Sequence, residues 1–168
     1  MRDRGRRAFS LVEILIVVVI IGILAAIAVP KFSNAATLSR ENSLKEDLRF
    51  LRTQLGIYST QHLDVYPGYP GGDTNQTPTE QTLVSQLTQV TDDAGNSSAT
   101  VTGAYKWGPY LPQMPVDPVN GSGSVKILGP GDAFVVDGMS GWLYQPATGE
   151  LKANVPGEDS SGQLFSDY

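Results

Sequence analysis

The chain has 168 residues, enough for one globular domain with a core and an extension. It contains no cysteine and one histidine, which excludes disulfides, thiolate zinc sites, cysteine nucleophiles and two-histidine metal sites. The net charge of −5 is uneven: residues 1–8 carry four arginines and one aspartate, whereas residues 67–168 carry three cations and eleven acids. An acidic surface offers nucleic acid no clustered cations, so no nucleic-acid partner is expected.

The chain begins with a basic leader, residues 1–8, followed by an apolar segment. Positions 14–29 read ILIVVVIIGILAAIAV, sixteen apolar residues in a row, and positions 9–13 extend the mostly apolar stretch to 21 residues. A helix needs ~20 such residues to cross the core of a bilayer. Residues 9–29 are therefore predicted to form a transmembrane helix. The preceding arginines predict a cytoplasmic N-terminus and a head on the far side of the membrane.

Hydropathy alone leaves two simpler interpretations of this segment open. The first is an ordinary membrane anchor. The second is a secretory signal peptide cleaved after Ala28, because Ala26-Ile27-Ala28 has the A-x-A form of a cleavage site. In the second interpretation, the mature chain would be a soluble exported binding domain or enzyme.

Glu13 fits neither of these interpretations. A charged, unpaired carboxylate at the edge of a membrane helix costs on the order of 2–3 kcal/mol, and an anchor or signal peptide has no use for it. A cut before Phe9 would create an α-amino group four residues from Glu13, on the same helix face. We expect this carboxylate to pair with that amine in its own chain or, better, in a neighbouring chain. Pairing between chains would neutralise both charges and fix the axial stagger of an assembly.

Residues 6–13, RRAFSLVE, with the apolar segment and Pro30, resemble the class III signal of type IV pilins and type II secretion pseudopilins. The resemblance implies that a membrane prepilin peptidase cleaves between Ala8 and Phe9 and N-methylates Phe9. Glu13 takes the acidic position of the family, the fifth of the mature chain, and Pro30 takes the place of its helix-kinking proline. Ala8 departs from the family's usual glycine but keeps a small residue there.

Residues 30–62 are predicted to continue as an amphipathic helix. Apolar residues spaced by four, three, four and three positions form one helical face, which we call the leucine face: Leu44, Leu48, Leu51, Leu55 and Tyr58. Glu41 and Lys45 have the spacing of a favourable i,i+4 pair. Fifty-odd residues give a rod of roughly 80 Å, which Pro30 should kink or loosen. The leucine face spans only two heptads, so packing against a globular head is favoured over a coiled-coil seam.

Residues 63–168 are predicted to form the globular head, beginning with a loop region over residues 63–123. Within it, residues 82–90 are compatible with a short helix capped by Thr79 or Thr82, and residues 92–98 with a polar turn. Residues 107–118 contain four prolines, which forbid regular ladders. They are expected to form an ordered connector pinned by Trp107, Tyr110 and Met114.

Residues 124–154 carry four strand signals separated by Gly, Pro and Asp turns, at 125–128, 133–136, 141–144 and 150–153. They predict a three- or four-stranded antiparallel meander laid against the leucine face. Its inward side is expected to carry some of Phe134, Val136, Trp142, Tyr144 and Leu151. The expected fold class is α+β, a long N-terminal helix packed on a small antiparallel meander as in type IV pilins. Residues 155–168 are predicted to be a loose acidic tail.

The connector and the strands also resemble the major pseudopilins of type II secretion. Residues 108–118, GPYLPQMPVDP, are similar to the segment that joins helix and sheet in that group, and residues 141–151 look like a hairpin of its relatives. The absence of cysteine points the same way, since many adhesive pilins close a C-terminal loop with a disulfide. The function expected is a structural pseudopilus subunit of the bacterial inner membrane, and the alternative is a type IV pilin for adhesion, motility or DNA uptake.

The resemblance also implies partners: other copies of the chain, other pseudopilins, the prepilin peptidase, membrane lipid before assembly, and an assembly ATPase, platform protein and secretin. No nucleotide-binding or catalytic motif is present, so the chain is not expected to be an enzyme.

Calcium is the one cofactor that the resemblance raises, because major pseudopilins bind Ca²⁺ in a C-terminal loop through carboxylate and carbonyl oxygens. The loop acids of this chain are dispersed and do not reproduce the spacing of that loop; they are Asp117, Asp132, Asp137, Glu158 and Asp159. We interpret them as turn-forming residues of an acidic head and expect no metal ligand among them.

Overall fold

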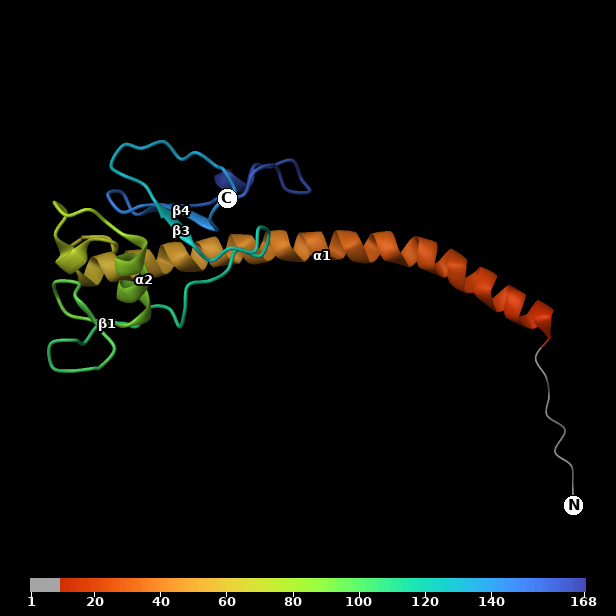
Figure 1. The fold of residues 1–168 in the computed structure, drawn as a ribbon, viewed down its shortest axis with the longest axis horizontal. Coiled ribbons are helices and arrows are strands. Elements are labelled where there is room, and N and C mark those ends of the chain that lie inside the picture. The colour runs from red at the N-terminus through yellow and green to blue at the C-terminus, as the bar shows by residue number, and fades with distance from the viewer. Residues whose placement is uncertain (1–9) are drawn as a thin grey trace, which may run out of the picture. The chain divides into compact units, whose positions relative to one another are not determined.

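The computed structural model describes residues 10–168, so the leader and the expected cleavage site between Ala8 and Phe9 lie outside the described residues. The chain divides into two compact units, Met1–Ser39 and Arg40–Tyr168, the second of which is the head (Figure 1). One helix, α1 (Leu11–Gln61), contributes to both units and runs through Pro30 without a break, although a proline has no N–H to donate to the preceding turn. The kink expected at this proline stays a prediction.

Helix α1 ends where the backbone turns into the left-handed region. Leu63 and Asp64 have φ angles of 56° and 63°, and the N–H of Asp64 donates to the carbonyl of Ser59 at 3.0 Å. This bond satisfies one of the carbonyls that the end of a helix leaves without a partner. His62, which is 4% exposed, bonds through its ring nitrogens to the Tyr58 carbonyl and to the Thr91 hydroxyl. The end of the helix is thereby joined to the loop region.

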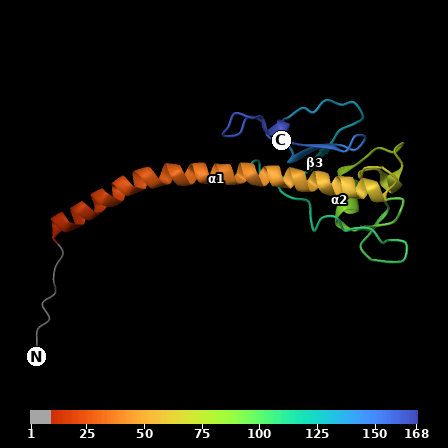
Figure 2. The same ribbon diagram turned by 180° about the vertical axis from the view of Figure 1, so that it is seen from behind.

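The leucine face of α1 forms one side of the head's core. All five of its side chains are at most 3% exposed. They share one apolar cluster with Trp142, Tyr144, Leu151 and Phe165 from the sheet and the C-terminal segment. Both views of the ribbon show the sheet lying along the head part of the helix (Figures 1 and 2).

A short helix, α2 (Glu80–Thr88), follows a single 3-10 turn, η1 (Pro70–Gly72). Thr79 caps α2, accepting a hydrogen bond from the N–H of Thr82 at 3.1 Å. The helix begins and ends two residues before the predicted span, because the chain is already extended at its C-cap, Gln89. It then enters β1 (Val90–Thr91), which pairs antiparallel with β2 (Ser97–Ser98) across the polar turn.

The main sheet has the order β3 (Val125–Ile127), β4 (Trp142–Gln145) and β5 (Glu150–Ala153). Strands β4 and β5 are antiparallel, with Trp142 opposite Ala153, whereas β3 runs parallel to β4, with Val125 opposite Trp142. The α+β class is thus confirmed, but the all-antiparallel meander is wrong.

The error comes from the predicted strand at residues 133–136, which forms no strand and leaves Val135 61% exposed. A middle strand would have reversed the chain direction between its neighbours. Without it, residues 128–141 form a crossover connection that returns the chain to the same end of the sheet, so β3 and β4 pair in parallel. Phe134 and Val136 are accordingly only partly buried, while Trp142, Tyr144 and Leu151 are in the core as expected.

The prediction of a loose tail is also wrong. Residues 155–168 end in a second 3-10 turn, η2 (Phe165–Asp167), and Phe165 is only 7% exposed within the core cluster. An isolated bridge between Glu158 and Leu164 closes the loop before it. The acidic composition misled the prediction, because the acid that orders this segment, Asp159, is an internal hydrogen-bond acceptor rather than a solvated charge.

Gln86 on α2 ties two loops of the head together. Its side chain is buried, and its amide accepts from the N–H of Gly68 at 2.7 Å and donates to the carbonyls of Tyr69 and Gly95 at 2.9 and 2.7 Å. Every polar atom of this amide is therefore used, so its removal would leave buried backbone groups without partners.

We expect Gln86→Leu to lower the free energy of unfolding by roughly 2–4 kcal/mol, since buried groups left unpaired cost about 1–3 kcal/mol each. Gln81→Leu, on the exposed side of the same helix, is the matched control and should change stability by less than about 0.5 kcal/mol. Denaturant unfolding followed by tryptophan fluorescence measures both. Equal stability of the two variants would contradict the role assigned to this amide.

Candidate functional site

The first unit exposes an apolar surface that water cannot solvate well. Residues 11–28 of α1 have a mean hydropathy of 3.2, and none of them is buried. Large side chains along this span are about half exposed, Ile20 at 52% for example. By length and composition the span is able to cross a membrane, and a helix that is apolar all round needs lipid or neighbouring helices to cover it.

Glu13 lies in the first turn of α1, on the exposed surface, with its backbone N–H donating to the carbonyl of Ser10 at 3.1 Å. No ion pair of its carboxylate is recorded among the described residues. An acid at this position interacts favourably with the helix dipole, by about 0.3–1 kcal/mol at an exposed site. The partner expected from the sequence, the Phe9 amine, is outside the described part of the chain.

In the head, the polar side of α1 holds the C-terminal segment through Asp159. The Asp159 side chain is 2% exposed. One carboxylate oxygen accepts from the N–H and hydroxyl of Ser161, at 2.8 and 2.6 Å, and from the N–H of Gln163 at 3.0 Å. The other accepts from the Lys45 ammonium at 3.2 Å and the Tyr168 hydroxyl at 2.6 Å. Hydrogen bonds from Ser161, Tyr168 and Gln163 hold the pKa of this carboxyl well below its ordinary value.

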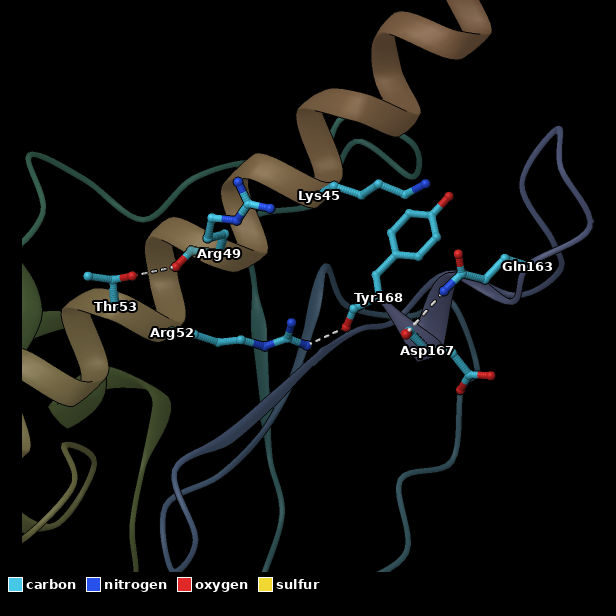
Figure 3. Close-up of a pocket in the computed structure, with 7 residues that line it drawn as sticks. All are labelled: Lys45, Arg49, Arg52, Thr53, Gln163, Asp167 and Tyr168. Atoms are coloured by element: carbon cyan, nitrogen blue, oxygen red, sulfur yellow. Dashed lines mark hydrogen bonds between the residues drawn. The ribbon is translucent and has the colours of Figure 1, made fainter.

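Two further residues of α1 bind the same segment. Glu41, 5% exposed, accepts from both the N–H and the hydroxyl of Ser160, at 2.9 and 2.6 Å. The Arg52 guanidinium donates to the carbonyl of Leu151 at 2.8 Å and to that of Tyr168 at 2.7 Å. Figure 3 shows Lys45 and Arg52 reaching from α1 toward Tyr168. In place of the predicted pairing of Glu41 with Lys45, Glu41 accepts two hydrogen bonds from the C-terminal segment and Lys45 donates one to it.

An open groove of about 620 Å³ borders this contact; it is lined by Lys45, Arg49, Arg52, Thr53, Gln163, Asp167 and Tyr168 (Figure 3). Its cations are already engaged within the chain. Lys45 and Arg52 hold the C-terminal segment, and Arg49 pairs at 3.3 Å with Glu46, where both side chains are at least 70% exposed. The groove is therefore the edge of a structural contact rather than a prepared anion site.

The remaining loop acids shape turns. Asp132 accepts from the N–H of Gly129 at 2.7 Å, and Asp137 pairs with Lys126 at 2.8 Å. Asp117 is fully buried, and one of its oxygens accepts from the N–H groups of Val119 and Asn120. Burial raises the pKa of this carboxyl. Within residues 10–168, no three acidic or histidine side chains converge on one point.

Comparison with known proteins matches both the leader and the head. The family model of the prokaryotic N-terminal methylation motif matches residues 3–29. The chain is 29% identical over 118 residues to the type II secretion system core protein G of Pseudomonas aeruginosa, covering 70% of this chain and 71% of the relative. Against the core protein G of Vibrio cholerae, identity is 28% over 134 residues, or 80% and 78% of the two chains.

The chain therefore carries the prokaryotic N-terminal methylation motif and is similar, over most of its length, to core protein G, a type IV pilin-like pseudopilin. Its class III signal and its exposed apolar helix fit a membrane-anchored member of that group. The chain is also 49% identical to the type IV major pilin protein PilA of Myxococcus xanthus, but only over 52 residues, 31% of this chain and 22% of the pilin. No solved structure matches it.

The site residues predicted from the sequence fall into three groups. Ala8 and Phe9 are not described, Glu13 and Pro30 belong to the first unit, and the leucine face is buried in the head. Sequence reasoning missed Lys45, Glu41 and Asp159 as a set that closes the head. Spacing places Glu41 and Lys45 on one helix face, but nothing local indicates a partner 114 residues away.

The pH dependence of stability tests the role of Asp159. Because its pKa is lower in the folded head than in the unfolded chain, its stabilising contribution is full above about pH 4 and is lost as the pH falls below that. An asparagine at this position has an amide nitrogen in place of one carboxylate oxygen. An amide nitrogen donates hydrogen bonds, so it cannot accept those of Lys45 and Tyr168. We expect Asp159→Asn to lower Tm at pH 7 and to flatten the fall of Tm between about pH 5 and pH 2.

Asp167→Asn provides the control for this measurement, because Asp167 is an acid of the same segment whose side chain is exposed. Thermal unfolding of the three proteins across the pH range should leave this control close to wild type. An unchanged acid slope in Asp159→Asn would refute the assignment.

Proposed function

We propose that the protein is a structural subunit of the pseudopilus that drives type II protein secretion. The observation that carries the proposal is an 18-residue apolar span of α1 with no buried residue, which lies within the residues that the methylation motif matches. A surface of this kind suits storage in a membrane and later burial among identical helices. The relatives align with the head as well as the leader, and they are named as core proteins of the type II secretion system. Both facts support type II secretion as the system.

The chemistry of assembly follows from the apolar helix. Prepilin peptidase would cleave between Ala8 and Phe9 and methylate the new amine. The helix can leave lipid because a filament core of packed helices is as apolar as the bilayer. Glu13 would then pair with the Phe9 amine of the adjoining subunit and set its register. No nucleotide motif is present in the chain, so an assembly ATPase and a platform protein would supply the energy.

We further propose that the precursor spans the bacterial inner membrane once. The arginine-rich leader stays in the cytoplasm by the positive-inside rule, and the head lies in the periplasm. Its partners there would be other copies of the chain, the remaining pseudopilins and the secretin. The role is structural rather than enzymatic.

A type IV pilin is the second candidate, favoured by the 49% identity to the Myxococcus pilin. That similarity covers 31% of the chain, whereas core protein G relatives cover 70–82% and therefore include head sequence. Deletion of the gene separates the two functions. Loss of secreted protein with normal motility and adhesion supports the pseudopilin, and the reverse supports the pilin.

The mature N-terminus is a direct test of processing. Mass spectrometry of the membrane fraction should find a terminal peptide beginning with N-methylphenylalanine at Phe9, because the motif places the cut there. A mature chain beginning after Ala28 would instead support the soluble exported domain, and an intact initiator methionine in cells that contain the peptidase would exclude processing.

The register pair is tested by Glu13→Val and Glu13→Gln. Both variants should insert into the membrane and be cleaved, yet form at least about tenfold fewer filaments, since an unpaired amine in an apolar core costs about 2–3 kcal/mol. Glu46→Gln in the head, whose side chain is 70% exposed, is the control and should assemble normally. Sheared-filament yield measured by immunoblot decides, and a normal yield of Glu13→Val would rule out the pair.

A further inference from the structure

We propose that the head of this pseudopilin closes its C-terminal segment without a divalent cation, because the ammonium group of Lys45 supplies the positive charge at that place. Family resemblance implies a calcium ion in the C-terminal loop. The donor chemistry of this chain does not fit one. The proposal concerns the folding of the head and stands apart from filament assembly, so the two can fail separately.

The buried carboxylate of the C-terminal segment, Asp159, is already saturated. Calcium takes six to eight oxygen ligands at about 2.3–2.6 Å, and carboxylates are its principal ones in proteins. Both oxygens of Asp159 accept hydrogen bonds, five in all, at 2.6–3.2 Å. A cation would have to displace the donors from at least one oxygen and leave a side chain with 2% exposure to reorganise around it.

The neighbouring acids do not complete a site either. Glu41 uses both of its oxygens to hold the N–H and hydroxyl of Ser160. Glu158, the other acid of the loop, is exposed to solvent. Across the described residues, no group of three acids or histidines is close enough to share an ion. A hard cation would therefore find one occupied carboxylate where it needs several free ones.

Lys45 provides the charge that a metal would otherwise bring. Its ammonium lies 3.2 Å from Asp159 and 4.2 Å from the centre of the Tyr168 ring, so it contacts both ends of the segment. A cation over an aromatic face is attracted by the ring quadrupole. A calcium ion bound at Asp159 would face this ammonium at close range and be repelled by it.

The position of Lys45 is set by the buried face of the helix beside it. Leu44 and Leu48 are at most 1% exposed, which fixes the rotation of α1 in the head. Lys45 thereby emerges next to the C-terminal segment with 40% of its side chain exposed. Because this cation is covalently part of the chain, closure does not depend on the concentration of any ion.

The test uses the full-length protein in detergent, with thermal unfolding followed by near-UV circular dichroism in millimolar CaCl₂ and in EGTA. We expect the wild-type Tm to differ by no more than about 1 °C between the two conditions. Lys45→Met should lower Tm by about 4 °C or more in both, and should expose the C-terminal segment to limited proteolysis. Arg49→Met is the matched control, because its guanidinium pairs only at the surface.

A double-mutant cycle separates the charge pair from general packing. Lys45→Met and Asp159→Asn together should destabilise the head by less than the sum of the single changes. A calcium-induced rise of several degrees in the wild-type Tm would overturn the proposal, as would a wild-type Tm for Lys45→Met. If Lys45→Met fails to fold, two measurements still test the proposal. They are the wild-type Tm in CaCl₂ compared with EGTA, and the Tm of Lys45→Arg, which keeps the positive charge.

Discussion

Burial of one face of a single helix is the constraint on which the head depends. Within residues 40–61, α1 presents a strip of leucines and a tyrosine that is almost completely covered by the sheet and the C-terminal segment. A three-stranded sheet of three- and four-residue strands has too little apolar surface to be stable alone, so it needs that strip as much as the strip needs it. Farther toward the N-terminus, the same helix has no such cover within its unit.

Polar contacts then decide which segments lie beside the strip. Glu41, Lys45 and Arg52 each hold a different part of the last eighteen residues, and Gln86 fastens two loops at the other helix. Apart from the exposed bond between Arg52 and Tyr168, these bonds are buried or partly buried, where a lost partner is costly. Apolar burial thus makes the head compact, and a small number of saturated polar groups make its arrangement unique.

Patterns local in sequence predicted the structure well. The four–three spacing of Leu44, Leu48 and Leu51 located the covered face, and the run of apolar residues located the exposed apolar span of α1, because both depend on neighbours within a few turns. Pairings over long distances were not predictable in this way. Residues 133–136 have strand composition but no strand partner, and Asp159 looks like a surface acid until Lys45, from another element, is placed beside it. The proposed register pair of Glu13 is neither a local pattern nor a long-range contact within one chain, since its expected partner is in another chain.

The parallel pairing of β3 with β4 has a consequence for the making of the molecule. Strand β3 can pair with β4 only after residues 142–145 have been synthesised. In the same way, the Arg52 guanidinium donates to a carbonyl that lies 116 positions later in the chain. Contacts of such long sequence separation form slowly, because the intervening chain must be ordered first. The head therefore cannot fold piece by piece as the chain is made; its final residues must be present before the first turns of its part of α1 are covered.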